Sequence, residues 1–478
     1  MIRKIALKEF KENLREGRFT VSVVIVSVLL IMGVWLSYNY LTSVQKQHAE
    51  AKENARNVWE SQDEKNPHSA AHYGTYAFKP KYPLSLIDPG VDKFSGISIF
   101  LEAHKRNEAQ YMAASDQTGL ARFGDLTPDF IMLFIIPLLI ILTGYNAFTR
   151  EIEQGTLKLL KSQGISSWKL ALAKWAGIFL PVLIITTVLF VIASILLMNI
   201  KDFGELNFGV LSLMFLVYLV YYAIFINITL MISAVSKQSG ISLVSLLAIW
   251  IIACLAMPKA SSNLADTVYP YPSRQAFAAD IDKDKKAGLD GHNPWSQAAK
   301  DFERETLEKY GVDSLSQLHF NFDGYRMQRG EEHEAQVYFK HYAELKNTFR
   351  NQSRIYQASA VASPFLPVRF LSMALARTDY SAHWDFADAA ENYRLSLIDT
   401  LNMNFAINSS YGDWAYKADR SLWKNVPDFE YDSPSLGDII DRNWTNVLIL
   451  GLWFLASFAG LKILTQRYEK EIKLHQSI

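Results

Sequence analysis

Six long apolar runs, separated by polar segments, dominate the pattern of this chain. They cover residues 21–41, 130–148, 175–200, 209–235, 241–257 and 444–464. Each run has roughly the length that a helix needs to cross a hydrocarbon layer of ~30 Å. The pattern therefore predicts six membrane-spanning helices, and an even number places both ends of the chain on one side of the membrane.

The first 20 residues intersperse Lys and Arg with apolar residues, which favours an amphipathic helix on the membrane surface. Tyr38, Asn39 and Tyr40 end the first apolar run, where a cleaved signal peptide would have small residues. We therefore expect an interfacial helix at 1–20 and a retained first span, with a cleaved leader as the less favoured alternative.

Two long connections join the spans, at 42–129 and 258–443. The first is expected to continue the first span as a polar stalk through 45–64. After the stalk, the breakers and aromatic residues of 67–89 favour strand or irregular structure. Its pattern is the less regular of the two.

The second connection is long enough to bury a core of its own. Apolar and aromatic residues recur in it at helical spacing, as in Tyr338, Tyr342 and Phe349, or Phe386, Tyr393 and Leu401. We interpret both series as core stripes. Residues 280–294 are polar and predict a loop, and Ser363-Pro364 predicts a turn before a further helix.

Composition and charge extend this picture. The chain of 478 residues is 50% hydrophobic and 20% charged, as expected for a membrane protein with large polar parts. The terminal tails and the short connections on their side are rich in Lys and Arg, which indicates the cytoplasm. The fold class is thus a mainly α polytopic membrane protein with six transmembrane helices and a large, mostly helical extracytoplasmic domain at 258–443. Zero formal net charge gives no reason to expect a nucleic-acid partner.

Signature motifs of the common nucleotide-binding and hydrolase families are absent from the sequence. It contains no G-x-x-x-x-G-K-[ST], H-E-x-x-H or G-x-S-x-G, so we expect no enzyme activity, no catalytic residue and no bound cofactor. Cys254 is the single cysteine, and His333 and His341 lie two helical turns apart, too far to share a metal unaided. We therefore expect no metal site, and any energy for transport has to come from a partner.

Residues 149–174 are polar between two apolar runs. Glu151 and Glu153 fit the first turn of an amphipathic helix, where carboxylates complement the helix dipole. Gly164 is expected to end this helix, and the serines after it to start the next one.

The run from Arg150 to Leu160 resembles the E-x-E-x-G-T-L signature of ABC type-2 permeases, the membrane subunits of ATP-driven exporters. In that family this segment is a coupling helix that docks in a groove of the ATPase. The resemblance implies that the ATPase-coupling residues are Arg150, Glu151, Glu153, Gly155, Thr156, Leu157 and Leu160.

A second resemblance covers the large connection. Segments such as Asn321-Phe322-Asp323-Gly324 and the run from Arg369 to Ala376 are similar to an uncharacterised domain in a subgroup of these permeases. The chain departs from its relatives at Gly164, where many have proline, and at Arg377, where glycine is frequent.

The two resemblances imply a permease of the bacterial inner membrane with cytoplasmic termini. Its partners would be a cytoplasmic ABC ATPase dimer that binds the ATP, a second permease in a homo- or heterodimer, and membrane lipid. We expect an exporter subunit. The alternative is a mechanotransmitter whose extracytoplasmic domain acts on a periplasmic partner without transport. A hydrolase within 258–443 is a third and weaker hypothesis. The substrate stays open among lipid, peptide and glycan.

Overall fold

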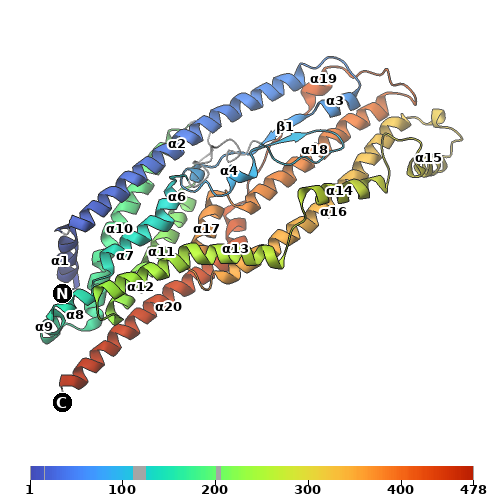
Figure 1. The fold of residues 1–478 in the computed structure, drawn as a ribbon. Coiled ribbons are helices and arrows are strands. Elements are labelled where there is room, and N and C mark those ends of the chain that lie inside the picture. Colours follow the sequence, from blue (N-terminus) through green and yellow to red (C-terminus); the bar gives the residue numbers. More distant parts are fainter. Residues whose placement is uncertain (1, 16, 111–124, 201–205, 477–478) are drawn as a thin grey trace.

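The computed structural model describes residues 2–15, 17–110, 125–200 and 206–476 (Figure 1). The protein is a mainly α, multi-pass membrane protein, so the predicted fold class is confirmed at this level. Six helices are long and apolar enough to cross a membrane, and each contains most of one predicted span: Gly17–Glu60, Pro128–Glu153, Ser167–Met198, Phe208–Val235, Ser239–Val268 and Leu436–Gln466.

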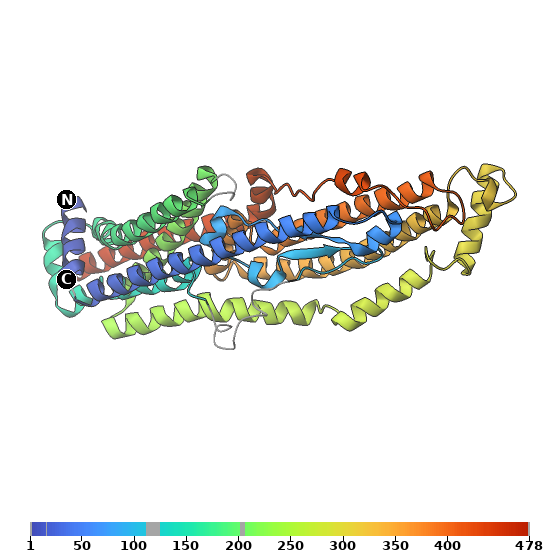
Figure 2. The same cartoon turned by 90° about the horizontal axis from the view of Figure 1, so that it is seen from above.

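The two ends of the elongated molecule are formed by different segments of the chain (Figures 1 and 2). One end, here called the terminal side, holds α1 (Ile2–Arg15), the short helices α8 (Thr149–Glu153) and α9 (Thr156–Ser162), and the far end of α20 (Leu436–Gln476). The other half, here called the loop side, holds the two long connections.

The helix α1 packs against α10 (Ser167–Met198), the third span. Gly177 permits this contact, because a Cβ at that position would lie 2.9 Å from the Cβ of Glu9. The interfacial helix predicted at 1–20 ends earlier, at Arg15, and residues 17–20 belong to α2 (Gly17–Glu60).

The centre of the bundle is α11 (Phe208–Val235), which packs against α20, α10, α12 (Ser239–Ile251) and α7 (Ile136–Gly144). The second span begins with α6 (Pro128–Phe130) and the π-helical turn η3 (Ile131–Ile135). Tyr221 and Tyr222 of α11 are fully buried, and their hydroxyls donate to the carbonyls of Leu133 and Met132 in η3 at 2.9 and 3.3 Å. These bonds satisfy phenol groups that would otherwise be costly inside the bundle.

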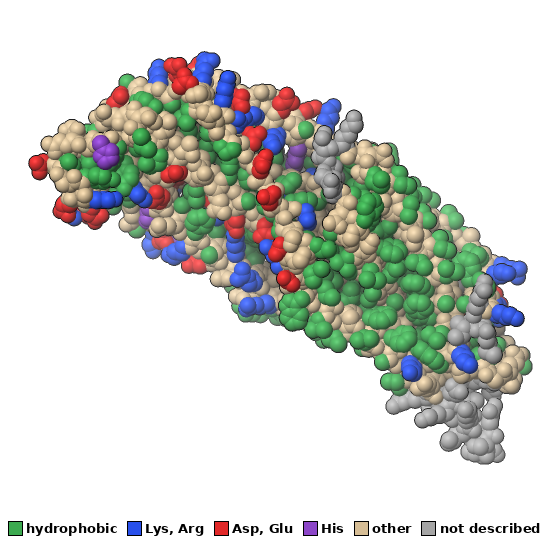
Figure 3. Space-filling model, turned by 180° about the vertical axis from the view of Figure 1, so that it is seen from behind, with side chains coloured by type: hydrophobic (Ala, Val, Ile, Leu, Met, Phe, Trp, Pro, Cys, Tyr) green, Lys and Arg blue, Asp and Glu red, His purple; other side chains and the backbone are tan. Residues whose placement is uncertain are grey.

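On the face shown in Figure 3, a broad hydrophobic surface covers the bundle, whereas most charged side chains lie on the loop side and a few Lys and Arg lie at the terminal end. Large apolar side chains on the outer faces of several spans are exposed, among them Ile31 and Trp35 on α2, Val244 on α12 and Leu455 on α20. Apolar surface of this extent is expected where helices face lipid.

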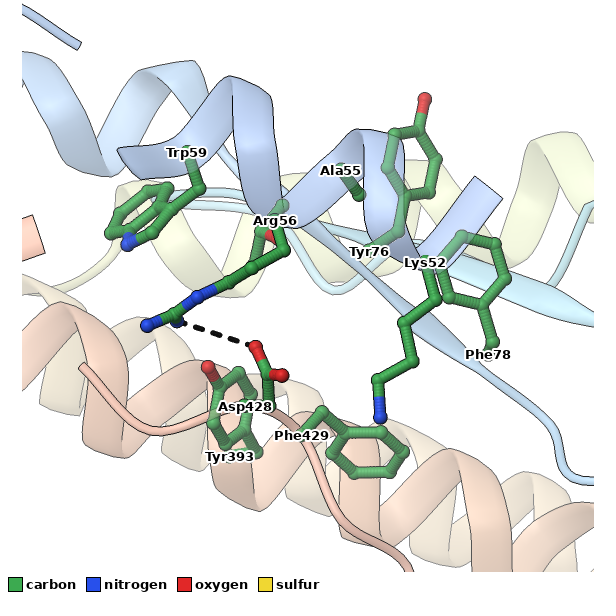
Figure 4. A pocket seen from close by; sticks show the side chains of 10 residues that line it. Lys52, Ala55, Arg56, Trp59, Tyr76, Phe78, Tyr393, Asp428 and Phe429 are labelled. Atoms are coloured by element: carbon green, nitrogen blue, oxygen red, sulfur yellow. Dashed lines mark ion pairs between the residues drawn. The ribbon is translucent and has the colours of Figure 1, made fainter. Parts of the chain in front are cut away.

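The first span continues far beyond the bundle, as the predicted polar stalk requires. The helix α2 has 44 residues and is therefore about 66 Å long. At its far end, Trp59 Nε1 donates to the carbonyl of Trp423 at 2.9 Å. Arg56 lies 3.3 Å from Asp428 and donates to the carbonyl of Val426 at 2.7 Å (Figure 4). The stalk is thus fixed to the end of the second connection.

Residues 67–89 are more regular than predicted. They contain α3 (Pro67–Tyr73), which Asn66 caps, the strand β1 (Thr75–Phe78) and the 3-10 turn η1 (Pro83–Leu86), and α4 (Asp92–Ser95) follows. The strand β1 pairs antiparallel with β2 (Ser98–Leu101). Both α3 and β2 lie on α18 (Tyr380–Asn408), so the first connection packs against the second.

The second connection is mostly helical, as predicted. The fifth span continues through the π-helical turn η4 (Ile252–Ala256) into α13 (Met257–Val268). Beyond it lie α14 (Arg274–Lys286), α15 (Gln297–Tyr310), η5 (Leu315–Gln317), α16 (Phe322–Ser359), α17 (Phe365–Ala376), α18 and α19 (Ser421–Asn425). The predicted loop at 280–294 is wrong for its first half. Ser273 caps α14 and Ile281 is buried, which holds this polar segment as a helix to Lys286.

The second connection buries a small core of its own around Ile281, Val337, Tyr338 and Tyr342, and it shares a further core with the first connection. One core cluster joins Trp59 and Ala71 of the first connection to Leu401 and Trp423 of the second. The aromatic stripes are core as predicted, with Tyr338, Tyr342, Phe386 and Leu401 buried.

The apolar helix α17 belongs to the core of the membrane bundle. Its Ser372 hydroxyl lies 2.8 Å from the Tyr218 hydroxyl of α11, and Ser363 just before it donates to the carbonyl of Ala253 at 2.6 Å. Arg377 ends α17 with a φ of +57°. This left-handed conformation favours glycine, and Arg377 adopts it although it has a Cβ.

Candidate functional site

The predicted coupling segment forms two short helices, α8 and α9, that connect the second and third spans on the terminal side (Figure 1). The prediction of one continuous helix is wrong, because Gly155 between them has a φ of +73°. A Cβ at Gly155 would meet nothing within 4 Å, so the backbone conformation and not crowding is what favours glycine there.

Glu151 ties α8 to two other helices. Its Oε1 lies 2.8 Å from the ammonium of Lys174 on α10, and the same ammonium lies 3.1 Å from Glu9 on α1. The Lys174 side chain is only 3% exposed. Because two carboxylates share one buried cation, a displacement of α8 alone would separate charges in a region with little water. The sequence reasoning missed this role of Lys174 and treated it only as part of the basic bias.

Glu153 ties α8 to the start of the fifth span. Its carboxylate accepts hydrogen bonds from the backbone N–H of Ser239 at 2.7 Å and from the Ser239 hydroxyl at 2.9 Å. The Thr149 hydroxyl lies 2.9 Å from that same hydroxyl. Ser239 is the first residue of α12, so Glu153 satisfies a free N–H group at the positive end of that helix.

The remaining predicted coupling residues divide between the interior and the surface. Leu157 is buried in the core of the bundle and Leu160 packs against that core, so both anchor α9. Arg150, Gly155 and Thr156 are exposed. Leu159 was not among the predicted residues, yet it is 61% exposed beside them. Leu159 therefore adds apolar area to the exposed surface of this short charged segment.

A cleft of about 310 Å³ opens between α1 and the α8–α9 pair. Residues of both charges line it, including Lys8 and Glu12 from α1 and Arg150 and Glu151 from α8. Mixed charge on a concave surface suits polar side chains of a protein partner, with which such groups can exchange hydrogen bonds.

The turn after α9 follows the prediction. Gly164 has a φ of +76°, and the Ser166 hydroxyl accepts a hydrogen bond from the Lys169 N–H at 3.4 Å as the N-cap of α10. Proline holds φ near −65° and cannot adopt the conformation of Gly164. A proline at this position would therefore require a turn of a different shape.

In the parts of the chain that the structure describes, groups of His, Cys, Asp and Glu with metal-binding spacing lie on the loop side and not at α8–α9. They are His68, His72, His104 and His292, and the trio His104, Glu331 and Glu334. From the sequence we considered His333 and His341 instead. His341 lies 2.9 Å from Asp284 and belongs to neither group. The sequence did contain one sign of a metal site, because His68 and His72 are spaced one helical turn apart.

Comparison with protein families matches residues 274–432 to a domain of unknown function (DUF3526). The match runs from α14 past α19 on the loop side and does not include α8 or α9. No curated protein matches the chain.

Proposed function

We propose that this chain is the permease subunit of an ATP-driven ABC exporter, and that a separate cytoplasmic ATPase acts on α8 and α9. One observation carries the proposal: α8 presents an exposed surface while Glu151 and Glu153 bond it to α10 and α12, and the Lys174 partner of Glu151 also pairs with Glu9 of α1. A force on this pair of helices therefore acts on several membrane helices together. The proposal places the terminal side in the cytoplasm of a bacterium, as the basic bias of its tails favours.

The second span would carry the displacement to the loop side. It runs from Pro128 to Glu153, so α8 is its terminal-side end. At the opposite end, Asp129 lies 2.5 Å from Arg369 of α17, and Asp88 lies 3.1 Å from the same guanidinium. The span is helical up to Gly144, and a turn at 145–148 joins it to α8. Charged contacts at both ends of this segment can transmit a shift between two arrangements.

Mechanotransmission is the second candidate, and the length of α2 favours it. This helix passes without interruption from the bundle to Arg56 and Trp59, which bond to the end of the second connection. The helix α17 likewise belongs to the core of the bundle. A change in the bundle would thus reach the loop side, where it could capture or release a periplasmic partner without a substrate crossing the membrane.

The test of the proposal is ATP turnover by the purified chain with and without its cognate ATPase in lipid vesicles. We expect no hydrolysis by the chain alone and a response of the ATPase that disappears in Glu151→Ala and Glu153→Ala. Lys169→Ala is the matched control, because Lys169 is an exposed residue near the start of α10. Robust hydrolysis by the isolated chain would overturn the proposal.

A transport assay distinguishes the two candidates, because an exporter accumulates a substrate across the membrane and a mechanotransmitter does not. Inside-out vesicles that contain the complex expose the ATPase to the outer solution, so ATP and labelled lipid, peptide or glycan in turn would be added outside, and an exported compound would accumulate in the lumen. Accumulation of one compound supports the exporter. ATP-dependent change in hydrogen exchange around Arg56 and Trp59 without any accumulation supports mechanotransmission.

A further inference from the structure

Four histidines from three separate segments meet on the loop side. His68 and His72 lie one turn apart on α3, His104 follows β2, and His292 follows α14. One ring nitrogen of each lies within 4.8 Å of those of the other three. The Nε2 atoms of His68 and His72 are 3.1 Å apart, and those of His104 and His292 are 2.6 Å apart. Four imidazole nitrogens therefore converge on one point.

Buried partners hold two of these rings by their other nitrogen. Nδ1 of His68 lies 2.9 Å from Oδ1 of Asn402, and the Asn402 amide donates to Gln328 at 3.2 Å. Both of these amide side chains are buried. Histidines that bind metals commonly have such a partner, which orients the ring and directs the free nitrogen at the ion.

His104 has a carboxylate partner. Its Nδ1 lies 2.7 Å from Oε1 of Glu331, a residue that is 1% exposed. The second oxygen of Glu331 lies 3.2 Å from the buried guanidinium of Arg394, which fixes the carboxylate in place. A carboxylate behind a ligating histidine is a common arrangement at zinc sites. His104 also has a φ of +65°, so the backbone at this position adopts an unfavourable conformation for a side chain that reaches the cluster.

The spacing of the nitrogens fits a small cation of the first transition series. Two imidazoles on a tetrahedral Zn²⁺ have nitrogens about 3.3 Å apart, at metal–nitrogen distances of 2.0–2.1 Å. The 3.1 Å pair already matches, and the 2.6 Å pair would need to open by less than about 1 Å. His292 is exposed and can move by that amount. Nitrogen donors select Zn²⁺, Cu²⁺ or Ni²⁺ and disfavour Ca²⁺ and Mg²⁺, which prefer oxygen.

Solvent has access to the site. His72 and His292 are exposed, and His72 and His104 line a cleft of about 970 Å³ together with Arg106 and Tyr338. An ion can enter from this cleft, while the buried His68 closes the other side.

We propose that the four imidazoles bind one divalent transition-metal ion of the zinc type. Three ligands belong to the first connection and His292 belongs to the second, within the segment that matches the domain of unknown function. The ion would therefore fasten the loop after α14 to α3 and join the two connections. This binding does not depend on the proposed ATP-driven function.

The test uses the full chain, purified in detergent without a histidine tag and stripped with a chelator. After Zn²⁺ is added and excess removed by gel filtration, elemental analysis should find one ion per chain. Co²⁺ in its place should give the strong visible absorption of a tetrahedral complex. Zn²⁺ should raise the melting temperature of the wild type, since an ion that binds only the folded state stabilises it.

His292→Ala and, separately, His72→Ala are the test variants, because both residues are exposed and their removal leaves the buried core intact. Each should weaken binding at least 10-fold and abolish the Co²⁺ spectrum. His319→Ala is the matched control, since His319 is an exposed histidine of the same connection outside the cluster.

Two results would overturn the proposal. The first is a chain that retains no Zn²⁺, which would leave two hydrogen-bonded imidazole pairs and no metal site, or one that binds Zn²⁺ equally in wild type and His292→Ala, which would show that the ion binds without His292. The second is binding that survives both test variants and is lost in Glu334→Gln, which would move the ion to the trio of His104, Glu331 and Glu334.

Discussion

Lys174→Met tests whether α8 is held to the bundle by a shared buried cation. The variant keeps the length of the side chain and removes the ammonium that lies 2.8 Å from Glu151 and 3.1 Å from Glu9. Removing one partner of a buried ion pair costs about 3–5 kcal/mol, because the other charge stays buried alone. The two carboxylate side chains are 13% and 17% exposed. They retain some contact with water, so we expect a loss near 3 kcal/mol, the lower end of that range.

The assay measures the free energy of unfolding of the full chain in detergent by denaturant titration. Lys169→Met is the control, since Lys169 is exposed on the same helix and should change the value by no more than about 0.5 kcal/mol. A triple variant of Lys174→Met with Glu9→Gln and Glu151→Gln should regain part of the loss, because no unpaired charge is left. If Lys174→Met and Lys169→Met unfold alike, the cation does not hold α8 in place.

Three further changes have defined outcomes. Asp92→Asn should cost about 3–5 kcal/mol, because Lys79 and Lys81 lie 2.5 and 2.9 Å from Asp92 and are buried with it. Burial raises the pKa of Asp92, but the two ammonium groups outweigh this and lower it below 3.8. The stability that this ion pair contributes is therefore present above pH 3.8 and is lost as the pH falls further. In a plot of melting temperature against pH, Asp92→Asn should reduce the fall at acid pH. Gly155→Ala should cost about 1–2 kcal/mol, measured by denaturant unfolding, because φ is +73° there. Gly164→Pro should abolish the response of the ATPase while the loop side keeps its melting behaviour, since proline cannot adopt a φ of +76°; an unchanged response would show that the turn tolerates another shape.

The apolar pattern was sufficient to predict the spans. Each needs only length and hydrophobicity, which a single window of sequence contains. The stalk was predictable for the same reason, because helical periodicity continues from the apolar run into polar residues up to Glu60. Core stripes such as Phe386 and Leu401 also follow from local spacing alone.

Features that depend on distant segments were not predictable in this way. Lys174 lies between Glu9 and Glu151, and no periodicity relates these positions. The four histidines come from α3, the segment after β2 and the segment after α14, so their meeting is a property of tertiary packing. Gly155 was assigned to a helix because a single glycine costs only about 1 kcal/mol in one, and the sequence does not reveal its positive φ.

The measurement that tests the central claim most directly is photo-crosslinking of the reconstituted complex. A photoreactive residue would replace Leu159, which is 61% exposed on α9, or Trp295, which is 80% exposed on the loop side. The account predicts that the residue at 159 crosslinks to the ATPase and that the residue at 295 does not. A crosslink from 295, or none from 159 in a complex that hydrolyses ATP, would contradict the claim that α8 and α9 receive the ATPase.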